Sequence, residues 1–169
     1  IVSYENHDFQ TAKDAFDLIL KKNDPIIVDS QTELQAQIYL LKIEKELGNK
    51  GIGLEKIHKK YQELLNQYGT KAATIDLQLA YARFLTYDFD RPYEAILLLK
   101  NILPLANSAF DIGAIQIEIA DVLVFTDQFN QALILYTQVQ NNLKNSNLAQ
   151  EARFKVARTS YFKGDFKWA

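Results

Sequence analysis

Apolar residues recur at helical spacing along almost the whole chain. The clearest stretch lies between residues 54 and 68, where the apolar positions share one face of a helix with 3.6 residues per turn: Leu54, Ile57, Tyr61, Leu64, Leu65 and Tyr68. Neither a sustained alternation of apolar and polar residues nor an Asn-Gly or Asp-Gly hairpin turn occurs. The pattern therefore predicts an all-α fold. We expect helices at 1–6, 8–23, 31–47, 53–68, 71–87, 91–103, 109–126, 128–144 and 148–163, with another starting near residue 165.

A short phrase returns along the chain and marks a repeat. Each copy has an acidic residue, then an aromatic residue or proline, and then an alanine: Ala12, Ala95, Ala132 or Ala169. A degenerate copy has Ile57 in this place, so successive offsets are 45, 38, 37 and 37 residues. Such a period is typical of a solenoid of stacked helix pairs. We expect one array over residues 1–169, of about four helix pairs, with repeat units at 1–29, 30–69, 70–107, 108–146 and 147–169.

Local signals at the predicted helix starts agree with this division. Ser30-Gln31-Thr32-Glu33 matches a capping box, in which the serine hydroxyl and the glutamate carboxylate satisfy backbone N–H groups of the first turn. Ser108 to Asp111 and Asn147 to Gln150 show the same capping pattern. Short connections between successive helices predict antiparallel packing.

The repeated residues resemble the tetratricopeptide repeat. The last unit follows that family's pattern most closely, with Ala152, Phe154, Val156, Ala157, Tyr161, Gly164, Asp165, Phe166 and Ala169. The resemblance implies a right-handed superhelix of antiparallel helix pairs and a non-enzymatic scaffold that binds a protein or peptide on its concave face. Residues 149–166 are similar to bacterial envelope-associated members, which favours the envelope or periplasm over the cytoplasm. Because the first and last repeats are incomplete, we expect a segment of a longer array, with further repeats in the same chain.

The resemblance also places candidate binding residues on the inner face, which the first helix of each repeat forms. They are Leu79, Arg83, Tyr87, Ile117, Asp121, Val124, Phe154, Arg158 and Tyr161. In the functional interpretation, the arginines grip carboxylates or carbonyls of a partner while the apolar side chains bury its apolar groups. In the alternative interpretation, the charges only pair with one another, Asp121 neutralising both arginines, and half of the aromatic residues belong to the core.

Composition narrows the function further. The net charge of −2 and the pI near 5.7 give no electrostatic reason to expect nucleic acid as a partner. No apolar run reaches the length of a transmembrane helix, so we expect no membrane insertion by this segment. Cysteine is absent, and the two histidines fit a turn (His7) and an exposed helix position (His58). With no nucleophile beside a base and no phosphate loop, we expect neither an enzyme nor a metal or cofactor site.

Two other functions stay open at this point. The array could be a structural spacer or oligomerisation arm of a larger bacterial envelope protein, with its partners on the convex face. An exposed apolar patch on that face would favour this interpretation. It could also be a glycan-binding module, although such a module needs long loops that carry aromatic residues, and the predicted loops are short.

Overall fold

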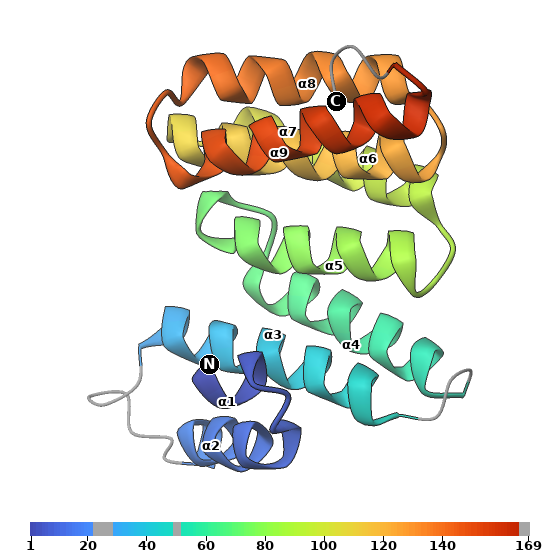
Figure 1. Cartoon of the computed structure of the whole chain (residues 1–169). Coiled ribbons are helices and arrows are strands. Elements are labelled where there is room, and N and C mark those ends of the chain that lie inside the picture. Colours follow the sequence, from blue (N-terminus) through green and yellow to red (C-terminus); the bar gives the residue numbers. More distant parts are fainter. Residues whose placement is uncertain (22–28, 49–51, 166–169) are drawn as a thin grey trace. The chain divides into compact units, whose positions relative to one another are not determined.

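The computed structural model describes residues 1–21, 29–48 and 52–165, and this part of the chain is helical without any strand (Figure 1). The all-α prediction is therefore confirmed. Contacts divide the chain into two compact units, residues 1–69 (unit 1) and 70–169 (unit 2). The division coincides with the predicted boundary between the repeat units 30–69 and 70–107. The continuous superhelix stays a prediction.

Unit 1 contains four helices: α1 (Val2–Glu5), α2 (Phe9–Lys21), α3 (Ser30–Leu47) and α4 (Ile52–Tyr68). A small apolar cluster joins α2 to α3 through Ala12, Phe16, Ala36 and Ile43. The ring of Phe16 stacks on that of Tyr39, with 5.1 Å between the centroids and 8° between the planes. The amphipathic pattern of α2 is thus explained, because its apolar stripe packs on α3.

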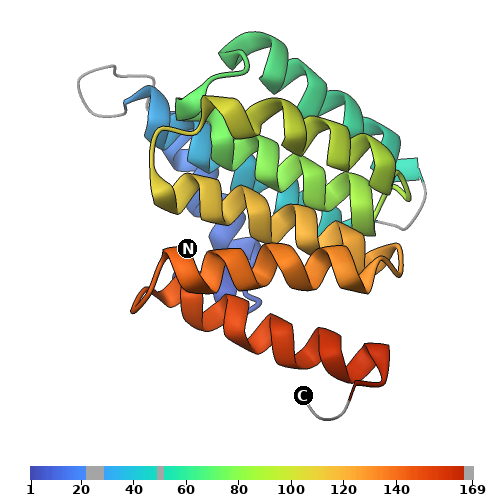
Figure 2. The same cartoon turned by 90° about the horizontal axis from the view of Figure 1, so that it is seen from above.

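Unit 2 contains α5 (Ile75–Tyr87), α6 (Pro92–Ile102), α7 (Ala109–Phe125), α8 (Phe129–Asn142) and α9 (Asn147–Lys163), with short 3₁₀ turns at Ala72–Thr74 and Leu103–Leu105. Helix α7 is central, since it packs against α5, α6, α8 and α9 (Figure 2). Accordingly, α7 is buried on several sides, and Ile115, Ala120 and Val122 are fully enclosed. A helix that is apolar nearly all round is expected in such a place.

The repeated phrase has a clear structural basis in its turns. Five residues before each alanine stands a residue with a left-handed backbone: His7, Asp90, Asp127 and Gly164, with φ of 60°, 53°, 59° and 84°. Glycine, aspartate and histidine are among the residues that tolerate this conformation best. The next amide closes the turn onto the preceding helix, as in the bonds from Gln128 N to Leu123 O and from Asp165 N to Ser160 O. The repeat read from the sequence is therefore a repeat of helix–turn–helix geometry.

The predicted helices agree with the observed ones to within a few residues, but α5 starts at Ile75 and not at residue 71, and the caps of two other helices differ. The first residue of α3 is Ser30, and its cap is Asp29, whose carboxylate accepts a hydrogen bond from Thr32 N at 2.7 Å. Likewise, the hydroxyl of Ser146 caps α9 one residue earlier than predicted. Ser108 caps α7 as predicted. The helix expected near residue 165 lies outside the described residues.

No helix in the described ranges combines the length and the apolar character that crossing a membrane requires.

Candidate functional site

The nine predicted binding residues lie on α5, α7 and α9 of unit 2, and their burial differs widely. Five are exposed: Arg83, Tyr87, Phe154, Arg158 and Tyr161. Leu79, Asp121 and Val124 are half-buried, and Ile117 is buried. We call the exposed surface formed by these residues and Phe125 the α5–α7–α9 face. Ile117 belongs to the core and is not available to a partner.

Arg83 on α5 is tied to a buried carboxylate on α7. Its Nε donates to Glu118 Oε2 at 2.6 Å, and the Glu118 side chain is 1% exposed while that of Arg83 is 56% exposed. Burial raises the pKa of the Glu118 carboxyl, and the attraction of Arg83 opposes this rise. The other carboxylate oxygen of Glu118 is buried without a hydrogen-bond partner. The exposed part of the Arg83 guanidinium remains open to solvent, so Arg83 can still donate to a second acceptor.

A second ion pair joins α7 to α9. Lys155 Nζ contacts the two carboxylate oxygens of Asp121 at 2.7 and 2.8 Å, and both side chains are largely buried. The hydroxyl of Tyr136 on α8 donates to the same carboxylate at 2.5 Å. Burial and the neighbouring Asp121 charge raise the pKa of Tyr136. Because Lys155 and Tyr136 already share its carboxylate, Asp121 serves the packing of α7, α8 and α9.

The observed pairing differs from the one that the sequence suggested. In the alternative interpretation of the sequence, Asp121 neutralises both Arg83 and Arg158, whereas in the structure its carboxylate pairs with Lys155 and Arg83 pairs with Glu118. In each pair, the two residues are 34 or 35 positions apart in the sequence. This separation is about one helical turn shorter than the repeat period of 37 or 38 residues. Sequence reasoning missed Glu118, Lys155 and Tyr136 as partners. The opposite charges at that constant spacing were the signal that could have found the first two.

Arg158 occupies the place on α9 that Arg83 has on α5 and Asp121 has on α7. Within the described ranges, no carboxylate pairs with its guanidinium, which lies 6.0 Å from the centre of the Phe162 ring. Phe154, Tyr161 and Phe162 lie within about one turn of Arg158 on the same side of α9 and are 64%, 60% and 57% exposed. Such a concentration of exposed aromatic rings around an arginine is unusual for a solvated helix face and is typical of binding surfaces.

Aromatic residues also line the ends of α5 and α7. The rings of Tyr87 and Phe125 meet edge to face with 5.5 Å between centroids, and both residues remain about half exposed. Phe162 has the equivalent place on α9. The Tyr87 and Phe125 rings form an apolar border beside the ion pairs, which is a combination that can anchor a peptide side chain and orient its polar groups.

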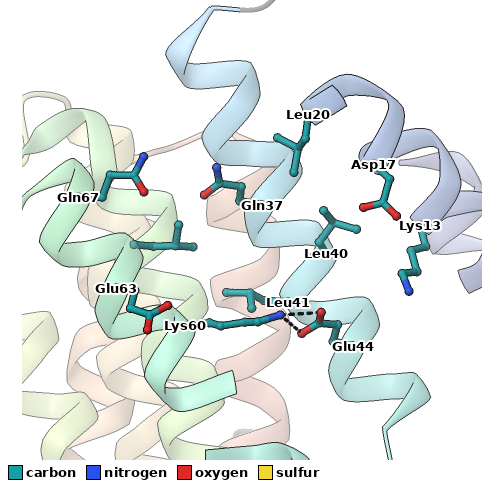
Figure 3. Close-up of a pocket in the computed structure, with 11 residues that line it drawn as sticks. Lys13, Asp17, Leu20, Gln37, Leu40, Leu41, Glu44, Lys60, Glu63 and Gln67 are labelled. Carbon is teal, nitrogen blue, oxygen red and sulfur yellow. Dashed lines mark hydrogen bonds and ion pairs between the residues drawn. The ribbon is translucent and has the colours of Figure 1, made fainter. Parts of the chain in front are cut away.

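Unit 1 has a hollow of a different character, between α2, α3 and α4 (Figure 3). Its volume is about 360 Å³, and leucines form its apolar part: Leu20, Leu40, Leu41 and Leu64. Lys60 crosses from α4 to Glu44 on α3 and contacts the two carboxylate oxygens at 2.6 and 2.7 Å. Lys13 and Asp17 of α2 also line the hollow (Figure 3). None of the predicted site residues belongs to this hollow.

The histidines do not form a metal centre in the described part of the chain, where no group of three or more His, Cys, Asp or Glu side chains could hold an ion. His7 is the predicted turn residue. His58, predicted to be exposed, is 8% exposed, because it lies one turn from both Leu54 and Tyr61 on the apolar stripe of α4.

No family model, curated protein or solved structure matches the chain. The resemblance to the tetratricopeptide repeat therefore stays a prediction.

Proposed function

We propose that unit 2 is a non-enzymatic protein-binding module that holds a segment of another protein on the α5–α7–α9 face. The observation that carries this proposal is the exposed surface of α9, where Phe154, Arg158 and Tyr161 lie together. The corresponding residues of α7, Ile117 and Asp121, are buried or paired. Binding of a partner to a surface of this composition is favourable, because it removes apolar area from water and gives Arg158 a carboxylate partner.

The surface indicates the chemistry of the partner segment. An acidic residue would pair with Arg158, and apolar side chains on either side of it would pack on Phe154 and Tyr161. Arg83 offers a second donor, because its guanidinium remains partly exposed beside Glu118. Asp121 is not expected to contact the partner, since Lys155 and Tyr136 already occupy its carboxylate.

The test is crosslinked affinity capture from the native cell with three baits. Wild type is compared with Arg158→Glu/Tyr161→Ala and with Arg153→Glu, which makes the same charge change at an exposed position on a different side of α9. Aromatic and arginine anchors at the centre of an interface contribute about 2 kcal/mol or more each. The double variant should therefore lose the partner while the Arg153→Glu control retains it, and circular dichroism should show that all three baits are folded. Identical captured proteins for all three baits would refute the proposal.

A second candidate function is favoured by a separate observation. Tyr93, Leu97 and Ile134 on α6 and α8 are 70%, 62% and 58% exposed, so an arm that meets its partner on those helices is also compatible with unit 2. The connections between α5 and α9 are short, which does not favour a glycan-binding module with long aromatic loops. Membership of a longer repeat array at the bacterial envelope stays part of the prediction from the sequence.

A further inference from the structure

A largely apolar groove lies between α6 and α8, with α7 as its floor. Its volume is about 520 Å³, within the usual range of ligand sites. We call it the α6–α8 groove, and its lining is Tyr93, Ile96, Lys100, Leu103, Gln116, Ile119, Leu123, Gln128, Gln131, Ile134 and Leu135. Three of these side chains are amides and a single one, Lys100, is charged. The groove thus combines an apolar body with one fixed positive charge.

The α6–α8 groove is separate from the α5–α7–α9 face. Successive residues of a helix are rotated by about 100°. Gln116, Ile119 and Leu123 therefore share one side of α7, while Glu118, Asp121 and Phe125 share the opposite side. A partner bound in the groove would not touch the ion pairs of the candidate site, and the two sites can be tested independently.

Unit 1 shows that the architecture does not require this groove to be apolar. The hollow between α2, α3 and α4 is built from corresponding helix faces: Gln37 and Leu40 line it as Gln116 and Ile119 line the α6–α8 groove. There, however, Glu44 and Lys60 form an ion pair across the hollow. The α6–α8 groove has Leu123 and Leu135 at these two places. The apolar lining is therefore a property of this groove and does not follow from the packing of the helices alone.

Two exposed side chains extend the apolar lining to the rim. Tyr93 on α6 is 70% exposed and Ile134 on α8 is 58% exposed. Along α6 and into the 3₁₀ turn that follows it, the lining runs from Tyr93 to Leu103, a length of about 15 Å at the rise of a helix. Lys100 lies within this length and has no carboxylate partner among the residues that the structure describes. An apolar trough of this length between two helices fits a third helix, whose side chains can interdigitate with both walls.

We propose that the α6–α8 groove binds an amphipathic helix of about three turns in a partner protein. Its apolar stripe lies between Tyr93 and Ile134, and an acidic residue of the stripe's border pairs with Lys100. We expect a negative charge on this helix because Lys100 is the single charged residue in an otherwise uncharged lining.

The test uses a fluorescently labelled, alanine-based helical peptide of about 15 residues. It carries leucines at i, i+4 and i+7 and a glutamate beside the middle leucine, and a second peptide has lysine in place of that glutamate. Fluorescence anisotropy with the whole chain should show saturable binding, about fivefold tighter for the glutamate peptide. In Lys100→Glu the preference should reverse, which a nonspecific apolar surface would not produce.

Two matched variants locate the binding. Ile134→Gln should weaken it about tenfold, because Ile134 lines the groove. Leu97→Gln makes the same change on an equally exposed leucine of α6 outside the lining and should leave it unchanged. Because both side chains are exposed, both variants should fold like wild type.

Three results would overturn the proposal: no saturable binding of either peptide, equal effects of Ile134→Gln and Leu97→Gln, or a charge preference that Lys100→Glu leaves unaltered. Decanoate serves as a competitor of the same charge and apolar character. Tight binding of decanoate without binding of either peptide would assign the groove to a small amphipathic carboxylate and refute a helical occupant.

Discussion

Replacing Asp121 with alanine should strongly destabilise unit 2. The Asp121 carboxylate accepts hydrogen bonds from Lys155 at 2.7 and 2.8 Å and from the buried Tyr136 hydroxyl at 2.5 Å. A hydrogen bond to a charged group contributes about 1.5–3 kcal/mol. Removing one partner of a buried pair costs about 3–5 kcal/mol, because the other charge is left without compensation. The Lys155 ammonium, whose side chain is 16% exposed, would keep only the more exposed Glu151 carboxylate, at 3.5 Å. We therefore expect Asp121→Ala to lower the free energy of unfolding by about 3–5 kcal/mol.

Denaturant unfolding followed by circular dichroism measures this loss, and amide hydrogen exchange shows whether it falls on α7 and α9. The control is Glu94→Ala, which removes an exposed ion pair with Arg91 at 3.3 Å and should cost less than about 1 kcal/mol. The double variant Asp121→Ala/Lys155→Met should recover part of the loss, because the unpaired ammonium is gone. If Asp121→Ala cost no more than Glu94→Ala, the assignment of Asp121 to helix packing would be wrong.

Two further predictions concern α7 and α4. Because burial raises the folded-state pKa of Glu118 above its usual 4.5, the folded protein holds that proton more tightly than the unfolded chain. The free energy of unfolding of wild type, relative to that of Glu118→Gln, should therefore be highest at a pH below the usual glutamate pKa and fall as the pH rises. Urea unfolding at a series of pH values measures this difference. A difference that grew with pH would contradict the assignment. Gly53→Ala, with nothing within 4 Å of the added methyl group, should stabilise α4 by about 0.5 kcal/mol. Gly113→Ala should give no gain in melting temperature, because its methyl group would lie 2.6 Å from Leu143 Cδ1. A gain equal to that of Gly53→Ala would show that the Leu143 side chain moves aside without a cost in stability.

Helix positions were predictable from the sequence because the apolar period and the turn residues agree at each repeat. Asp90 and Asp127 illustrate this, since their left-handed turns recur at the fixed distance from an alanine. Exact helix starts were less predictable. Asp29 and Ser30 are both good capping residues, and only the backbone conformation decides that Asp29 is used. In the same way, Thr74 bonds to the backbone of Lys71 and holds a 3₁₀ turn where a continuous helix from residue 71 was predicted.

The candidate site was predictable as a set of faces and not as a set of contacts. The resemblance to the tetratricopeptide repeat put Arg83, Asp121 and Arg158 at equivalent positions of three helices. It could not supply the rotation and offset between neighbouring helices, on which the choice of Glu118 and Lys155 as ion-pair partners depends. Burial was likewise undetermined, because Ile117 and Phe154 have the same place in the repeat and yet are 3% and 64% exposed.

The central claim is that a partner segment lies on the α5–α7–α9 face. Amide hydrogen exchange of the chain alone and in complex with its captured partner tests this claim most directly. We expect a bound partner segment to protect α9 between residues 151 and 162 and the last turns of α5, and we expect this protection to be lost in Arg158→Glu/Tyr161→Ala. Unchanged exchange in α9, or protection confined to α6 and α8, would contradict it.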